Sequence, residues 1–187
     1  MKKVFQFRYK IILGVYPKSL NSSNIKNCEE SDEYDPYSIH FVALDEDGDI
    51  SATVRLIHHS PIGYPTENSS TFDKSMFERY KLAEMSRIFI ATKYRSMQST
   101  KNIINGLKKL MFVKMMQLGV EYSYGSLEEN FLRLLKIYKL CYHTLANKSS
   151  HGSIGSRYPC ILYTKQFGTD NPELIKLWEK ECETEIF

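Results

Sequence analysis

The chain has 187 residues, 42% of them hydrophobic and 13% aromatic, which is enough for one sizeable core but not for two. Its 25 basic and 22 acidic side chains leave a formal net charge of +3. This balance excludes the uniformly positive field typical of nucleic-acid-binding proteins. We therefore expect a single domain spanning residues 1–187, with no nucleic acid as partner.

The cysteines and the start of the chain carry no signal for a metal, a redox motif or a membrane. The four cysteines contain no C-x-x-C pair, so the sequence predicts no metal site and favours reduced thiols. The basic start is followed by an apolar stretch at residues 11–13 that is too short for a signal peptide or a membrane span. We expect a cytoplasmic protein without an integral membrane segment.

The first half of the chain predicts loops around a β-hairpin. Residues 21–35 are rich in Ser, Asn, Asp and Glu and lack apolar periodicity, which indicates a loop. Residues 40–44 and 50–57 are two β-favourable runs on either side of an acidic turn that contains Gly48, the pattern of an antiparallel hairpin. Residues 60–75 contain prolines, a glycine and small polar side chains, and they predict a long surface connection.

The second half alternates strands and helices. A strand at 85–90 leads into a helix at 99–118, whose apolar residues recur at helical spacing and which ends at Gly119. A strand at 120–124 and an amphipathic helix at 127–138 follow.

Two late β segments, at 141–145 and 159–164, lie on either side of the Gly/Ser-rich residues 148–156. The whole order predicts a mixed α/β domain without internal repeats.

Three segments place charge beside apolar strand residues. They are Asp32-Glu33-Tyr34-Asp35, Thr53-Val54-Arg55-Leu56 and Ala83-Glu84-Met85-Ser86-Arg87-Ile88-Phe89. A charge inside a buried strand is costly unless it is paired, so Arg55, Glu84 and Arg87 are expected to meet partners. Asp32 and Asp35 are the nearest candidates in the sequence. A structural ion-pair network and a catalytic cluster explain this spacing equally well.

Strand periodicity adds two geometric expectations. Arg55 should point away from Ala52, Val54 and Leu56, because alternate residues of a strand face opposite sides. A regular strand would also send Glu84 and Arg87 to opposite faces, so a β-bulge is needed if both line one pocket.

The three charged segments resemble, in order and in spacing, the signature segments of the acyl-homoserine-lactone synthases, and the match runs from Asp32 to Arg95. The resemblance implies the GNAT fold, a mixed and mostly antiparallel central sheet flanked by helices. It also implies that Glu84, Arg87 and Arg55 are catalytic, with Glu84 as the general base. The implied substrate-binding residues are Asp32, Asp35, Met85, Ile88 and Phe89, with Arg8 added because of an Arg-Tyr pair near the start.

Two departures from that family bear on the acceptor. The segment before the acidic motif lacks the family's tryptophan and its fuller helical stretch, and the only tryptophan is Trp178. The N-acyl amino acid synthases, which are similar in fold, tolerate a shorter start. Their Gly-x-Arg-x-Pro pattern before a final strand also resembles residues 155–159. The resemblance therefore favours an amino acid as acceptor.

The turn after the Glu84 strand bears on the acyl donor. Acetyl-CoA-dependent relatives have glycines there that admit a pyrophosphate, whereas this chain has Gln98 and Thr100, which weaken such a cradle. The acyl-phosphopantetheine of an acyl carrier protein is thus preferred over acyl-CoA as donor substrate, with no bound cofactor. The basic residues for carrier docking are Lys93, Arg95 and Lys101, followed by Lys108, Lys109 and Lys114. A merely solvated helix face is the alternative for each of them.

The expected function is transfer of a fatty acyl group from the carrier protein, or from acyl-CoA, to the amine of a small acceptor. A carboxylate within reach of the amine is the simplest base, and strand backbone N–H groups can bind the oxyanion. Three alternatives stay open: an acyl-homoserine-lactone synthase using S-adenosylmethionine, a non-catalytic module that binds acyl groups or their carrier, and an acetyl-CoA acetyltransferase.

Overall fold

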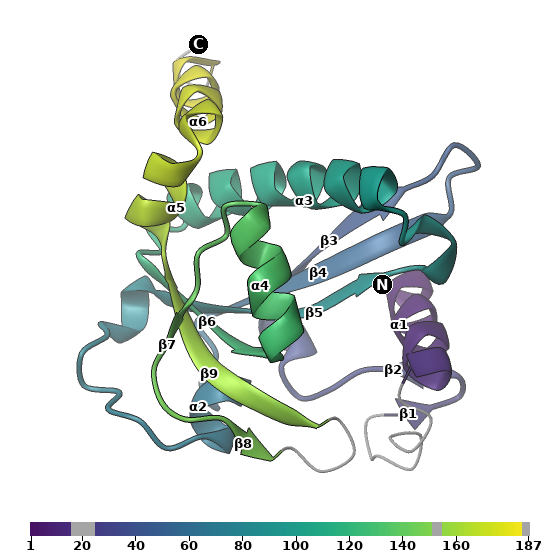
Figure 1. The fold of residues 1–187 in the computed structure, drawn as a ribbon, viewed down its shortest axis with the longest axis horizontal. Coiled ribbons are helices and arrows are strands. Elements are labelled where there is room, and N and C mark those ends of the chain that lie inside the picture. Colours follow the sequence, from purple (N-terminus) through teal and green to yellow (C-terminus); the bar gives the residue numbers. More distant parts are fainter. Residues whose placement is uncertain (16–24, 151–154, 185–187) are drawn as a thin grey trace.

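A computed structural model describes residues 1–15, 25–150 and 155–184 (Figure 1). The strands are β1 (Ile25–Lys26), β2 (Glu29–Glu30), β3 (Ser38–Leu44), β4 (Ile50–His58), β5 (Leu82–Ile90), β6 (Tyr122–Leu127), β7 (His143–Thr144), β8 (Ser149–Ser150) and β9 (Ser156–Tyr163). The helices are α1 (Lys2–Val15), α2 (Pro65–Ser69), α3 (Met97–Gln117), α4 (Glu129–Ile137), α5 (Thr164–Asp170) and α6 (Pro172–Thr184). Short 3-10 turns occur at Asp35–Tyr37, Arg79–Lys81 and Thr92–Tyr94.

The central sheet has the strand order β3-β4-β5-β6-β9-β7, with β8 also paired to β9. Within the described residues every pair in this sheet is antiparallel except β5 with β6. The predicted mixed, mostly antiparallel sheet flanked by helices is confirmed. None of the described helices combines the length and the apolar character needed to cross a membrane.

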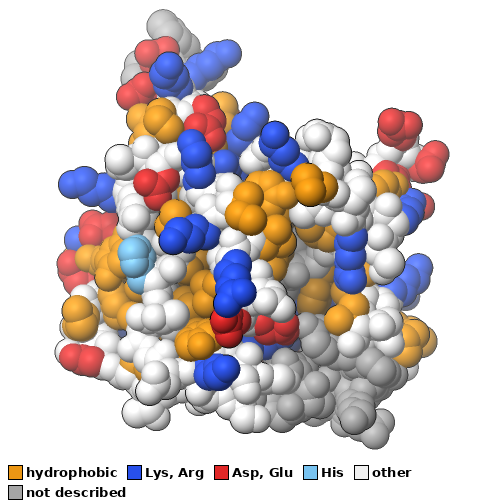
Figure 2. Space-filling model, in the orientation of Figure 1, with side chains coloured by type: hydrophobic (Ala, Val, Ile, Leu, Met, Phe, Trp, Pro, Cys, Tyr) orange, Lys and Arg blue, Asp and Glu red, His pale blue; other side chains and the backbone are white. Residues whose placement is uncertain are grey.

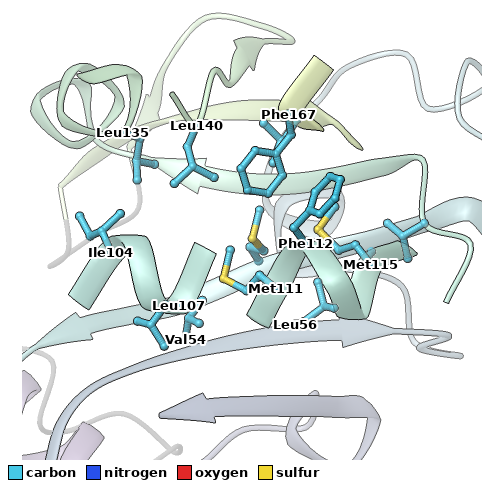
Figure 3. Packing of buried hydrophobic residues seen from close by; sticks show 14 of the residues in the cluster. Val54, Leu56, Ile104, Leu107, Met111, Phe112, Met115, Leu135, Leu140 and Phe167 are labelled. Carbon is cyan, nitrogen blue, oxygen red and sulfur yellow. The ribbon is translucent and has the colours of Figure 1, made fainter. Parts of the chain in front are cut away.

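One face of the sheet carries the larger apolar core, which is formed with α3 (Figure 3). Val54 and Leu56 of β4 meet α3 side chains at helical spacing, among them Leu107 and Met111, because one stripe of the helix faces the sheet. The chain from α4 to α6 adds Leu135, Leu140, Phe167 and Leu174 to this core.

The opposite face of the sheet is covered by α1 and α2. Helix α1 packs against β4 and β5, and α2 packs against β6 and β9. A smaller aromatic cluster, which includes Tyr64 and Tyr124, lies on this face. Because helices cover both of its faces, β4 is buried from Ser51 to Ile57.

Strand β5 contains an irregularity that reorients its side chains. Thr53 pairs with Phe89 and Arg55 pairs with Ser86, so β5 has one residue more than β4 between these pairs. The extra residue produces a β-bulge in which Arg87 has a φ of +52°, a left-handed conformation that is uncommon for arginine. The bulge required by the sequence argument is therefore present.

Strands β5 and β6 separate after only three residue pairs. Leu82–Glu84 of β5 pair with Tyr122–Tyr124 of β6. Beyond these pairs, β5 continues beside β4 and β6 continues beside β9. A gap between the two strands therefore begins directly after Glu84, toward the C-terminal ends of both strands.

The predicted hairpin and the central strand–helix–strand–helix order are confirmed with shifted boundaries. Helix α3 begins before residue 99 because Ser96 caps it, its Oγ accepting from the Ser99 N–H at 3.2 Å. Helix α4 begins only at Glu129 because Leu127 still pairs with Tyr158 in the sheet.

Other expectations were wrong. The stretch 21–35 contains the β1–β2 hairpin rather than only a loop, and its first four residues lie outside the described ranges. The connection 60–75 contains α2, and the stretch 148–156 contains β8, while 151–154 are not described. Helices α1, α5 and α6 were not predicted from the sequence.

Candidate active site

The sheet face beneath α1 carries a network of six charged side chains. The network consists of three arginines, Arg8, Arg55 and Arg87, and three carboxylates, Glu30, Asp32 and Asp35. They come from α1, β4, β5, β2 and the segment that leads into β3. Its formal charges balance, three against three.

Arg55 is the centre of the network and is fully buried. Its Nη1 donates to Asp32 Oδ1 at 2.5 Å and to Asp35 Oδ1 at 2.9 Å, and its Nε donates to Ser86 Oγ at 2.9 Å. The partners expected from the sequence are therefore its partners in the structure. Its Nη2 is buried and has no hydrogen-bond partner among the described residues.

Arg8 and Arg87 close the network from its two sides. Arg8 Nε donates to Glu30 Oε2 at 2.5 Å, and its Nη1 and Nη2 donate to the two oxygens of Asp35 at 2.7 and 3.2 Å. Arg87 donates to Glu30 Oε1 at 2.8 and 3.0 Å and to Asp32 Oδ2 at 2.7 Å. The bulge makes this possible, because it turns Arg87 to the same face as Arg55.

The network holds its carboxylates in the ionised form. Burial alone would raise the pKa of Asp35, but the hydrogen bonds and charge of Arg8, followed by the charge of Arg55, lower that pKa to about 2. Burial likewise opposes ionisation of Asp32, and Arg55 and Arg87 lower its pKa. His40 of β3 lies 3.5 Å from Asp35, and burial is the main cause that lowers the pKa of this histidine.

Glu84 lies on the same sheet face but outside this network. It is 1% exposed, and both of its oxygens accept hydrogen bonds from Thr66 of α2. Burial raises the pKa of Glu84 to about 7, against the opposing effects of the Thr66 hydrogen bonds and the Arg55 charge. Glu84 pairs with Tyr124 in the last residue pair before β5 and β6 separate. A buried carboxylate that titrates near neutral pH thus sits where the gap begins.

Helix α2 is itself fixed by buried contacts. Tyr64 Oη donates to the Leu82 carbonyl of β5 at 2.6 Å, and the Tyr64 N–H donates to Glu67 Oε1 at 3.0 Å. Arg79 Nη1 donates to both oxygens of Glu67 at 2.7 and 2.9 Å. At the other end of the helix, Asn68 Nδ2 donates to Tyr34 Oη at 3.0 Å, which connects α2 to the acidic segment 32–35.

The other predicted substrate-binding residues are distributed over both faces of β5. Met85 is 2% exposed in the core under α3, and Ile88 packs against the same core. Phe89 pairs with Thr53 beyond the bulge and is half-buried. The structure therefore brings together Arg8, Asp32, Asp35, Arg55 and Arg87, with Glu84 beside them and Met85 on the opposite face.

The predicted docking residues differ in their environments. Lys93 is 61% exposed and donates to Asp45 Oδ2 at 2.9 Å, and Arg95 Nε donates to the Ile90 carbonyl at 3.0 Å. Lys101 is exposed near the start of α3. A surface role was wrong for Lys108, which is 5% exposed and donates to Asn171 Oδ1 at 2.6 Å.

Two residues that hold the site together were not predicted from the sequence. Glu30 binds two of the three arginines, and its only signal was its place in an acidic run just before Asp32. Thr66 lies in a Pro/Ser-rich stretch with no pattern that points to Glu84, because their contact is purely tertiary. Among the described residues, no group of His, Cys, Asp and Glu is arranged to hold a metal ion.

Comparison with known proteins shows the family of the chain. Residues 7–105 match the family model described as "Acetyltransferase (GNAT) domain". The chain belongs to this GNAT acetyltransferase family and is an acyltransferase. No curated protein matches it in sequence.

Solved structures share its fold at low identity. The CoA-dependent acyl-homoserine lactone synthase BjaI, solved with SAM and isopentyl-CoA, has a TM-score of 0.68 at 12% identity, covering 92% of this chain and 81% of its own. TofI, in a ternary complex with an inhibitor and MTA, has a TM-score of 0.65 at 14% identity, covering 92% and 91%. FeeM, an N-acyl amino acid synthase from uncultured soil microbes, has a TM-score of 0.60 at 13% identity, covering 88% and 87%.

Proposed function

We propose that this protein, acting as a single domain over residues 1–187, transfers a fatty acyl group from an acyl carrier protein to the amino group of an amino acid. The observation that carries the proposal is Glu84, a buried carboxylate with a pKa of about 7 at the point where β5 and β6 separate. A general base works best when its pKa lies near the working pH. In this proposal the acyl thioester binds beside Glu84, where the backbone of β5 is no longer paired with β6.

The reaction needs one base and one site for developing negative charge. The amine nitrogen attacks the thioester carbonyl and gives up a proton to Glu84, directly or through one water, while the C–S bond breaks and the thiolate leaves and is protonated. Thr66 occupies one acceptor position on each carboxylate oxygen, which leaves others for that proton. The edge of β5 beyond Glu84 no longer pairs with β6, so its backbone N–H groups are suited to bind the oxyanion.

The arginine–carboxylate network has a positioning role in this proposal. Its arginines lower the pKa of Asp32, and that of Asp35 to about 2, so these carboxylates are much weaker proton acceptors than Glu84, whose pKa is about 7. The network instead fixes segment 30–35 and α1 on the sheet face beside Glu84. Among the described residues, Arg55 Nη2 is the network's one buried nitrogen without a hydrogen-bond partner, and in this proposal it binds the carboxylate of the acceptor.

The carrier protein is favoured as donor by the turn before α3. Gln98 and Thr100 stand where relatives that use acetyl-CoA have glycines, and the Ser96 side chain already occupies the Ser99 N–H. Figure 2 shows hydrophobic side chains exposed across the middle of one face, with Lys and Arg side chains beside them. An acidic carrier protein bearing an acyl chain suits such a surface. This donor also places the enzyme in the cytoplasm.

Acyl-homoserine-lactone synthesis is the second candidate, favoured because the three charged segments meet in one network and because the fold is similar to that of BjaI.

The test of both candidates is to incubate the purified protein with acyl carrier protein charged with medium or long acyl chains. Parallel reactions receive a mixture of amino acids or S-adenosylmethionine, and mass spectrometry identifies the products. An N-acyl amino acid released with free carrier thiol is expected. Acyl-homoserine lactone would establish the second candidate, and stable binding without turnover would refute both.

A further inference from the structure

Both hydrogen-bond donors of Thr66 bind the carboxylate of Glu84, the proposed base. Its backbone N–H donates to Glu84 Oε2 and its Oγ1 donates to Glu84 Oε1, both at 2.9 Å. Thr66 is fully buried, so water does not compete for either donor. Two donors on two different oxygens fix the orientation of the carboxylate plane and stabilise its ionised form relative to the protonated form.

The loop before α2 is built so that this contact can form. Gly63 has a φ of +82°, and a Cβ at this position would lie 2.5 Å from Glu67 Oε1. Any side chain there would displace Glu67, which accepts from the Tyr64 N–H at the start of α2. Glu67 is in turn held by Arg79. The short helix is therefore placed by tertiary contacts, and Thr66 with it.

We infer that Thr66 is a positioning residue whose hydroxyl sets the proton affinity of Glu84, and thereby the lowest pH at which acyl transfer proceeds. The inference rests on the proposed role of Glu84 as general base. Replacing the hydroxyl with a methyl group leaves the charge and the volume of the side chain nearly unchanged but takes away a donor to the ionised carboxylate. Glu84 then holds its proton to higher pH.

The other ionisable groups around Glu84 do not produce the same shift of the pH profile. Among the charged groups, Arg55 lowers the pKa of Glu84 and Glu67 raises it. Four tyrosines that interact with Glu84, namely Tyr34, Tyr64, Tyr124 and Tyr142, have a pKa raised mainly by burial, to about 12 in the case of Tyr64. These tyrosines therefore keep their protons between pH 5 and pH 9, the range of the test.

The first experiment measures kcat/KM for acyl transfer against pH in Thr66→Val and Thr66→Ser. In the wild type, kcat/KM rises with pH as Glu84 ionises. In Thr66→Val this rise should move to higher pH by about one unit, with about a tenfold loss on the acid side and a plateau within about twofold of wild type. Thr66→Ser, which keeps the hydroxyl, should restore the wild-type profile. Thr66→Ala replaces the valine variant should valine disturb the fold.

Thr164→Val is the matched control. Thr164 is also a buried threonine, 3% exposed at the start of α5, but its hydroxyl has no hydrogen-bond partner among the described residues. Its replacement should leave the pH profile in place. An equal loss at every pH in Thr66→Val would mean a merely structural role and would overturn the inference.

A second readout separates this inference from the proposed function. Carbon-13 NMR of labelled glutamate carboxyls, with Glu84→Gln to assign the signal, follows the ionisation of Glu84 without turnover. An upward displacement of the Glu84 titration in Thr66→Val supports the inference even in a protein that transfers no acyl group. An unchanged titration overturns it, whether or not the wild type is active.

Discussion

Replacing Arg55 with methionine tests whether the network stabilises the fold through its charge balance. Arg55 is fully buried, and Asp32 and Asp35 have side chains only 7% and 6% exposed. Removing the arginine leaves two arginines against three carboxylates, so one buried negative charge is uncompensated. Removing one partner of a buried ion pair typically costs about 3–5 kcal/mol. This is a large part of the 5–15 kcal/mol by which a domain is usually stable.

The cost should depend on pH in a defined direction. In the wild type, the pKa of Asp35 is lowered to about 2, so its contribution to stability is complete above about pH 4 and is lost as the pH falls towards 2. Without Arg55 the pKa of both aspartates rises, and so does that of His40, which Arg55 also lowers. Protonation then relieves the excess charge. The penalty in Arg55→Met should therefore shrink by about 1–2 kcal/mol between pH 7 and pH 4.5.

Urea unfolding of wild type and variant at both pH values measures this penalty. Asp32→Asn added to Arg55→Met removes the excess charge and should recover part of the loss. Arg133→Met is the control, because Arg133 forms an exposed pair with Glu129 and its loss should cost less than about 1 kcal/mol. If Arg55→Met cost no more than Arg133→Met, or if its cost were the same at both pH values, the charge-balance reasoning would be refuted.

Three further results are expected. Glu84→Gln should lower acyl transfer about 10²–10⁴-fold. Retained turnover would contradict the base assignment. Between about pH 4.5 and 7 the folded wild type keeps a proton on Glu84 that the unfolded chain has lost, because folding raises the pKa of Glu84 to about 7, so the wild type should lose stability as the pH rises through this range. Glu84→Gln should abolish this loss of stability. Gly63→Ala should cost about 2 kcal/mol or more in thermal or urea unfolding, and Gly48→Ala distinctly less, because only at Gly63 does the new Cβ meet another atom. Lys101→Glu should reduce kcat/KM with acyl carrier protein but not with acyl-CoA, whereas Lys176→Glu on α6 should change neither; equal effects on both donors would exclude a docking role.

Local signals made the centre of the fold predictable. The acidic turn with Gly48 between two β-favourable runs gives the β3–β4 hairpin, and the apolar stripe of α3 gives its longest helix. Strand alternation also placed Arg55 on the face opposite Ala52 and Val54, as the structure has it.

Two of the helices that escaped prediction, α1 and α2, lack a long uninterrupted apolar stripe. Helix α1 buries Val4, Arg8 and Ile11, at helical spacing, but the middle one is an arginine, so the apolar stripe is interrupted where the ion network begins. Helix α2 has only five residues and is held by Tyr64, Glu67 and Arg79 rather than by its own propensity.

The candidate site was predictable in its members but not in its arrangement. The cost of burying unpaired charge was enough to connect Arg55 with Asp32 and Asp35. The contact of Glu84 with Thr66 instead of an arginine was not predictable in this way, because a buried carboxylate can be satisfied by neutral donors or by a raised pKa. The bulge at Arg87 was inferred only as a condition, since no residue there favours a positive φ.

The early separation of β5 and β6 also affects how the molecule unfolds locally. Only three residue pairs join the ladder of β3, β4 and β5 to that of β6, β9 and β7. Each ladder keeps its own pairing when these few bonds open, so the two are natural units of sub-global unfolding. In amide hydrogen exchange, the β5 edge next to the gap should lose protection long before the β4–β5 pairing does. Anything that binds in the gap would bridge the two ladders and slow that exchange.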